Sequence, residues 1–136
     1  MILYEDKDII VCHKMAGIAV QSARIGEKDL VSMLNNHLME QAGQRMEPVR
    51  VVHRLDQPVE GIVVFAKNKK AAASLSAQIT DGSMKKVYQA VCCVTEAGRH
   101  WIGNAGKNDQ ELIDYMAKDA RTNSSAVVKK GQKDAK

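Results

Sequence analysis

The sequence lacks the features that mark membrane-spanning and secreted proteins. None of its apolar runs approaches the ~20 residues that a helix needs to cross a bilayer. Its first residues, MILYEDKD, lack the basic region followed by an apolar one that marks a secretory signal. We therefore expect a cytoplasmic protein with no membrane partner.

The sequence also lacks the residue spacing of a metal site. The cysteines Cys12, Cys92 and Cys93 form no Cys-x-x-Cys pair. Neighbours in a strand point to opposite faces, so Cys92 and Cys93 cannot jointly hold a metal in extended structure. The histidines are scattered, and His13, His37 and His100 show no ligand spacing. We expect reduced thiols and no metal.

Length and composition are those of one ordinary globular domain. The chain has 136 residues, 45% hydrophobic and 26% charged, and this length buries roughly two-thirds of the surface that the unfolded chain exposes. The formal net charge of +4 permits a polyanionic partner but does not demand one.

Strand-like and helix-like segments are mixed along the chain. Leu30, Leu34 and Leu38 recur four residues apart, as on one face of a helix. The predicted elements are strands over 2–4, 9–12, 49–53, 62–66, 87–95 and 126–128 and helices over 27–42 and 69–81, with Asn68 as an N-cap and Gly43 and Gly82 as stops. This order predicts an α+β fold with a mixed, mainly antiparallel sheet and two flanking helices.

Regular patterns fade after residue 95. The stretch EAGRHWIGNAGKNDQ is rich in glycine and polar residues, as loops are. We expect residues beyond about 97 to be weakly structured and residues 1–136 to be part of a longer domain. A natural short protein with a ragged end is the alternative, and the residues alone do not separate the two.

The stretch VVHRLDQPVEGIVVFAK, residues 51–67, places polar residues between two apolar runs. If the chain there is extended, His53 and Leu55 share one face while Arg54 and Asp56 share the other, about 6.6 Å apart. An adjacent guanidinium favours an ionised carboxylate, which suits a nucleophile or base. The alternative is a surface Arg–Asp pair worth at most about 1 kcal/mol.

The same stretch resembles the signature of the ribosomal large-subunit pseudouridine synthase A family, in which His-Arg-Leu-Asp precedes a turn, a glycine, an apolar strand and Ala-Lys. The resemblance extends to ILYEDKDIIVCHKMAGIAVQ before it and LSAQITDGSMKKVYQAVC after it. Residues 2 to about 95 are therefore similar to the family, whereas residues 110–136 are only faintly so.

The resemblance implies a pseudouridine synthase fold and the isomerisation of uridine to pseudouridine in ribosomal or transfer RNA, without a metal or an organic cofactor. It makes Asp56 the catalytic residue, acting on either the uracil ring or the sugar. The target base must be flipped out of its stack; Arg54 then holds the flipped nucleotide and Tyr88 stacks on the uracil. We expect Lys67, Lys85 and Lys86 to contact the RNA backbone.

Several residues depart from the commonest family pattern. Val59 and Glu60 stand where many members have Thr-Ser, His13 replaces an Asn, and Met15 replaces a Pro. A glutamate pointing into the site would repel phosphate, so we expect Glu60 to face solvent.

Other functions and states stay open. The first alternative is a catalytically silent RNA-binding module with the same fold. The second is a small protein with an accidental Arg–Asp pair and no affinity for RNA. We also expect the 136-residue chain alone to be inactive or weakly active. It is expected either to cover an exposed sheet edge, by forming a homodimer or exchanging elements with a second copy, or to leave residues beyond about 97 poorly ordered.

Overall fold

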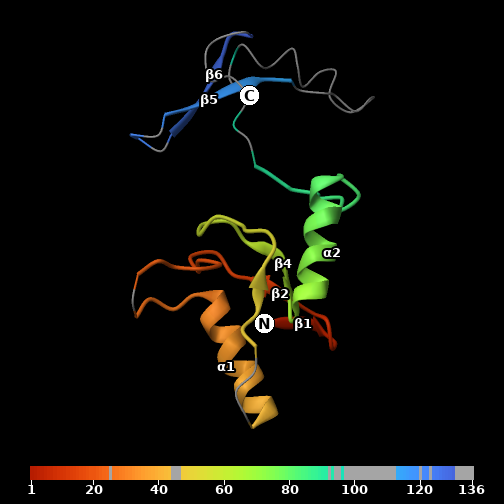
Figure 1. Ribbon diagram of the computed structural model, residues 1–136. Coiled ribbons are helices and arrows are strands. Elements are labelled where there is room, and N and C mark those ends of the chain that lie inside the picture. The colour runs from red at the N-terminus through yellow and green to blue at the C-terminus, as the bar shows by residue number, and fades with distance from the viewer. Residues whose placement is uncertain are drawn as a thin grey trace. The chain divides into compact units, whose positions relative to one another are not determined.

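The computed structural model describes residues 1–24, 26–43, 47–91, 93, 96, 113–119, 121–122 and 124–130. The chain divides into two compact units, Met1–Tyr88 and Gln89–Lys136 (Figure 1). Within the described ranges, no helix is both long enough and apolar enough to span a membrane.

The first unit is built on a four-stranded antiparallel sheet. Its strands are β1 (Ile2–Glu5), β2 (Ile9–Lys14), β3 (Arg50–Val51) and β4 (Gly61–Ala66), in the spatial order β1-β2-β4-β3 (Figure 1). The longest pairing joins β2 and β4, from Ile9 opposite Ala66 to Lys14 opposite Gly61. The α+β prediction with a mainly antiparallel sheet and two helices is confirmed.

Helix α1 (Leu30–Ala42) begins three residues later than the helix expected over 27–42 and ends at the predicted stop, Gly43. The Asp29 carboxylate accepts a hydrogen bond from the backbone N–H of Ser32 at 2.7 Å, as an N-cap does. Gly43 adopts the left-handed conformation, with φ of 63°, and its N–H bonds to the Met39 carbonyl. The apolar stripe of α1 joins the strands in one core cluster, whose buried members are Ile10, Cys12, Val20, Leu30, Leu34, Leu38, Val49, Val63 and Phe65.

Helix α2 (Lys69–Thr80) follows β4 and contacts β4 and β3. Asn68 caps it by accepting a hydrogen bond from the Ala71 N–H at 2.9 Å. Its half-buried face is made of Ala71, Ala72, Leu75 and Ile79. The predicted N-cap of this helix is therefore confirmed.

Two predicted strands are wrong in extent or in kind. The strand expected over 49–53 is reduced to Arg50–Val51. The strand expected over 87–95 is absent in its described part, where residues 87–91 have no regular structure and Val91 is fully exposed. A strand needs a hydrogen-bonded neighbour, and no described strand pairs with these residues. Residues 92, 94 and 95 lie outside the described part.

The second unit contains an antiparallel hairpin of β5 (Tyr115–Asp119) and β6 (Ser124–Val128). The strand expected over 126–128 is therefore longer in the structure, Ser124–Val128. Strand β5 was not predicted, because we expected weak structure beyond residue 97. The Lys130 ammonium lies 5.7 Å from the centre of the Tyr115 ring, a cation–π distance. Residues 97–112 and 131–136 lie outside the described part.

Candidate active site

Residues 53–56 connect the end of β3 to a tight turn, and their side chains alternate in burial. His53 and Leu55 are half-buried, while Arg54 and Asp56 are exposed. This is the alternation that an extended chain imposes, so the predicted sharing of faces is confirmed. Arg54 and Asp56 are thus both presented to solvent.

His53 is a packed residue that completes the sheet. Its Nε2 atom accepts a hydrogen bond from the backbone N–H of Val64 at 3.1 Å. Burial lowers the pKa of His53, and the positive charge of Lys86 lowers it further. Both effects favour the neutral ring that this acceptor role requires. His53 is therefore a hydrogen-bonded structural residue.

Leu55 packs against the core and against Gly61, the first residue of β4. A Cβ atom at residue 61 would lie 3.0 Å from Cδ1 of Leu55, closer than side-chain carbons ordinarily approach. The glycine after the turn therefore lets Leu55 turn inward without a shift of its side chain, and this inward turn leaves Asp56 on the outside.

The turn itself runs from Asp56 to Val59 and is tied to a second loop. The Val59 N–H bonds to the Asp56 carbonyl at 3.0 Å and closes the turn. The Gln57 carbonyl accepts the Gly17 N–H at 2.9 Å, and the Gln57 side-chain amide donates to the Gly17 carbonyl at 3.0 Å. Gly17 has φ of 86°, a left-handed conformation that glycine adopts at little cost.

Lys14 holds the same two loops from inside the protein. It is fully buried, and its Nζ donates to the carbonyls of Met15 at 3.2 Å, Ile18 at 2.7 Å and Gln57 at 3.0 Å. Burial lowers the pKa of Lys14, while the negative charges of Asp56 and Glu60 oppose that shift. A buried ammonium close to the Asp56 carboxylate is thus part of the site.

The sequence analysis missed Lys14, although a signal was present. On β2 the inward positions alternate as Ile10, Cys12 and Lys14, which places a lysine on an apolar face. A buried lysine is rare unless it is paired or hydrogen-bonded. That pattern could have identified it as a structural cation.

The predicted pairing of Arg54 with Asp56 is wrong for the structure as it stands. Within the described residues no ion pair joins them, and both side chains are exposed. Their backbone positions share a face, but two exposed side chains gain too little from pairing to hold one geometry. The negative charge of Asp56 also acts on Lys14, where it opposes the lowering of the Lys14 pKa by burial.

Glu60 is exposed, as expected, and it is also paired. Its Oε1 atom lies 2.8 Å from Nε2 of His13, and the side chains are 52% and 31% exposed. Two of the residues that depart from the family pattern are therefore partners in the structure.

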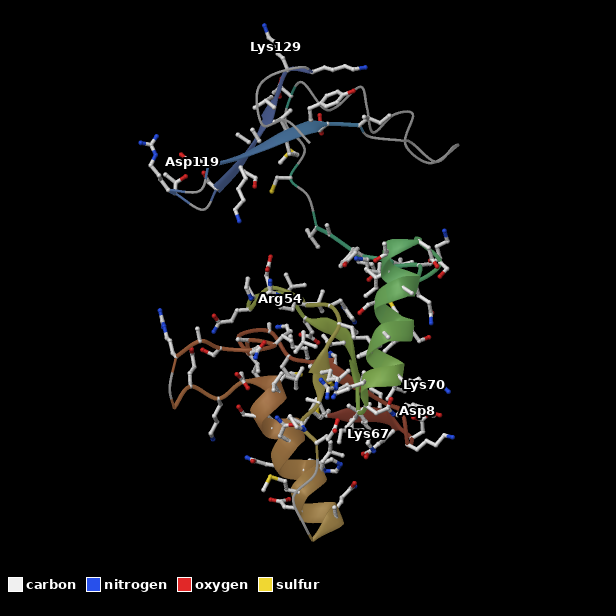
Figure 2. All side chains as sticks on the ribbon, viewed as in Figure 1. Asp8, Arg54, Lys67, Lys70, Asp119 and Lys129 are labelled. Carbon is white, nitrogen blue, oxygen red and sulfur yellow. The ribbon has the colours of Figure 1, made fainter. Side chains whose placement is uncertain are left out.

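The remaining predicted residues fall into two groups. Tyr88, Lys85 and Lys86 are exposed in the irregular stretch after α2, with Tyr88 64% exposed. Lys67 lies at the end of the sheet away from Arg54 (Figure 2). Its ammonium is 2.7 Å from Glu5 Oε1 and 2.8 Å from the Asp6 carbonyl, and its side chain is 14% exposed. The Lys67 ammonium is thus engaged by Glu5 and Asp6 within the fold, whereas we expected it to contact the RNA backbone.

Glu5 has a second partner, since its Oε2 atom is 3.1 Å from His37 Nε2. The pKa of Glu5 is lowered, chiefly by the hydrogen bond from Lys67 and also by His37. Over the described ranges, no group of three or more His, Cys, Asp and Glu side chains is arranged to hold a metal ion.

Comparison with known proteins gives one consistent group of relatives. The family model described as RNA pseudouridylate synthase matches residues 8–136. An uncharacterised RNA pseudouridine synthase of Bacillus subtilis is 36% identical over 90 residues, which cover 66% of this chain and 30% of the relative. The tRNA pseudouridine synthase C of Vibrio cholerae is 28% identical over 134 residues, which cover 93% of this chain and 51% of the relative.

A solved structure is similar in fold as well. Human RNA pseudouridylate synthase domain containing 4 matches with a TM-score of 0.52 at 26% identity, over 60% of this chain and 30% of the human chain. The chain spans about half or less of the length of these three relatives.

Proposed function

The chain belongs to the RNA pseudouridylate synthase family, and from that premise we propose that it isomerises uridine to pseudouridine in structured RNA with Asp56 as the catalytic carboxylate. The substrate class is ribosomal or transfer RNA. The reaction breaks the bond between the ribose and the uracil nitrogen, rotates the base, and rejoins it to the sugar through carbon.

One observation supports the role of Asp56 above all: an exposed carboxylate stands on a turn whose neighbouring residues are fixed. Leu55 packs into the core on one side, and the Gln57 carbonyl is held by Lys14 and Gly17 on the other. Positioning a reacting group in this way removes much of the entropic cost of reaction. An aspartate of a merely solvated loop would not be held from both sides.

Two exposed residues, Arg54 before the turn and Tyr88 after α2, suit an unstacked nucleotide. A target uridine must leave its helix, which costs a few kcal/mol, and stacking on an aromatic ring such as Tyr88 returns about 1–3 kcal/mol. Arg54 can hold a phosphate by bidentate contact. We assign backbone contacts to Lys85 and Lys86, and we assign Lys67 to the fold because Glu5 and Asp6 already engage it.

The test is tritium release from RNA labelled at carbon 5 of uracil, with the protein as its gene encodes it. We expect release by the wild type and by Asp114→Asn, which changes an exposed aspartate outside the turn. Asp56→Asn should abolish release while filter binding to the same RNA stays within about twofold, because only the reacting carboxylate is lost.

Other outcomes distinguish the alternatives. Salt-dependent RNA binding without release by the wild type would favour the silent binding module. If the wild type neither binds RNA nor releases tritium, the hypothesis of a small protein without RNA affinity is favoured. The homodimer through the edge of the sheet stays a prediction, with sedimentation velocity as its measurement.

A further inference from the structure

The His13–Glu60 pair joins the strand before the Gly17 loop to the residue after the Asp56 turn. His13 lies on β2 opposite Ile62, and Lys14 lies opposite Gly61. Glu60 directly precedes β4, so its contact with His13 runs diagonally across the two strands. The pair therefore closes the sheet at the point where the turn rejoins it.

The turn thus has two attachments on opposite sides of Pro58. At its start, the Gln57 carbonyl is held by Lys14 Nζ and the Gly17 N–H. At its end, the Glu60 carboxylate is held by His13 at 2.8 Å. The hydrogen bond from the Val59 N–H to the Asp56 carbonyl closes the turn around Gln57 and Pro58. The two side chains that make these attachments, Lys14 and His13, are adjacent residues of β2.

The charges give the pair a second consequence. Lys14 responds to the negative charges of both Asp56 and Glu60. Pairing with His13 gives Glu60 a partner of its own. Without His13, Glu60 loses the partner at 2.8 Å and gains the freedom to turn toward Asp56 or toward an approaching phosphate.

We propose that His13 and Glu60 are positioning residues, whose contact fixes the end of the turn that presents Asp56 to the target uridine. The proposal rests on the function proposed above. An ion pair this exposed contributes little to global stability, so its effect is local. Small displacements of a reacting group reduce rates strongly, so its effect is expected in kcat.

Kinetics of four variants test the pair. We expect His13→Ala and Glu60→Ala each to lower kcat about tenfold, since a misplacement of about 1 Å can cost up to a hundredfold. The double variant should be no worse than either single one, because they remove the same contact. Glu60→Gln keeps a side-chain oxygen for His13 and should recover most of kcat. Glu47→Ala, which removes the exposed Arg50–Glu47 pair at 3.0 Å, is the matched control and should change nothing.

The alternative is a purely electrostatic effect on RNA binding. Glu60→Ala and Glu60→Gln remove the same negative charge, so that alternative predicts the same fall in KM for both and an unchanged kcat. Such a result would overturn the proposal. Equal losses of kcat from His13→Ala and Glu60→Ala, recovered in Glu60→Gln, support positioning.

Amide hydrogen exchange tests the same contact without RNA. We expect faster exchange of the Val59 amide in both alanine variants than in the wild type, Glu60→Gln or Glu47→Ala. If the wild type releases no tritium, faster Val59 exchange still supports the anchored turn while the proposed function fails. Unchanged Val59 exchange in His13→Ala would overturn the positioning role even if the enzyme is active.

Discussion

The His53 side chain accepts the backbone hydrogen bond of Val64 that a neighbouring strand would otherwise accept. Its ring nitrogen accepts the Val64 N–H at 3.1 Å, just after β3 stops pairing with β4. A buried N–H without a partner is costly, so the ring satisfies β4 while the backbone of residues 53–56 leaves the sheet. Because the His53 ring replaces a backbone acceptor for Val64, β3 can end at Val51 and the chain can leave the sheet, which exposes Asp56.

The first prediction concerns acid. The pKa of His53 is lowered in the folded protein by burial and by Lys86, so between the folded pKa and about 6.5 the unfolded state binds more protons. The contribution of His53 to stability is therefore complete above about pH 6.5 and is lost as the pH falls through the folded value.

The measurement is urea unfolding of the wild type and His53→Gln at several pH values. The glutamine oxygen can accept the Val64 N–H without titrating, so the variant should lose less stability on acidification. Parallel pH profiles for the two proteins would show that His53 does not titrate as predicted.

The second prediction concerns the buried cation. Lys14→Met keeps the apolar stem but removes three buried hydrogen bonds to carbonyls, and we expect a loss of about 2 kcal/mol or more in the free energy of unfolding. Chemical denaturation measures it. Lys7→Met, at an exposed lysine of the same charge, should stay within about 0.5 kcal/mol of the wild type. An equal effect of both substitutions would count against a structural role for Lys14.

The third prediction concerns the glycine after the turn. Gly61→Ala brings a methyl group to 3.0 Å from Leu55 Cδ1, and overpacking of this kind costs about 1–3 kcal/mol. Urea unfolding should show that loss. Adding Leu55→Val shortens the opposing side chain and should recover part of the lost free energy of unfolding. If the losses from the two substitutions add instead, the two side chains do not compete for the same space.

The fourth prediction separates lysines that contact RNA from lysines that hold the fold. Lys85→Ala and Lys86→Ala should each reduce the slope of log affinity against log salt by about 1, because each removes a phosphate contact. Lys67→Ala should leave the slope unchanged and instead lower stability, with a rise in the pKa of Glu5 toward its ordinary value.

Filter binding at several salt concentrations measures the slopes, and Lys70→Ala, an exposed lysine near Lys67 (Figure 2), is the control. A reduced slope in Lys67→Ala would return that residue to the RNA interface.

The sequence by itself determined the local features of this protein. The caps at Asn68 and Gly43, the leucine stripe of α1 and the alternation over 53–56 were all predictable. Each depends on neighbours within a few residues, through helix period, strand period and backbone capping. These features were sufficient to place Asp56 on the outside of the turn.

Only the tertiary structure decided which charged groups meet. Lys14 with Gln57, His13 with Glu60 and Lys67 with Glu5 are each more than 40 residues apart in the sequence. Any exposed lysine can pair with many carboxylates, and the choice depends on strand register and burial. The wrong prediction of a strand over 87–95 has a related cause. The sequence indicates that a segment can be extended, but the segment becomes a strand only beside a hydrogen-bonding partner, which the tertiary structure decides.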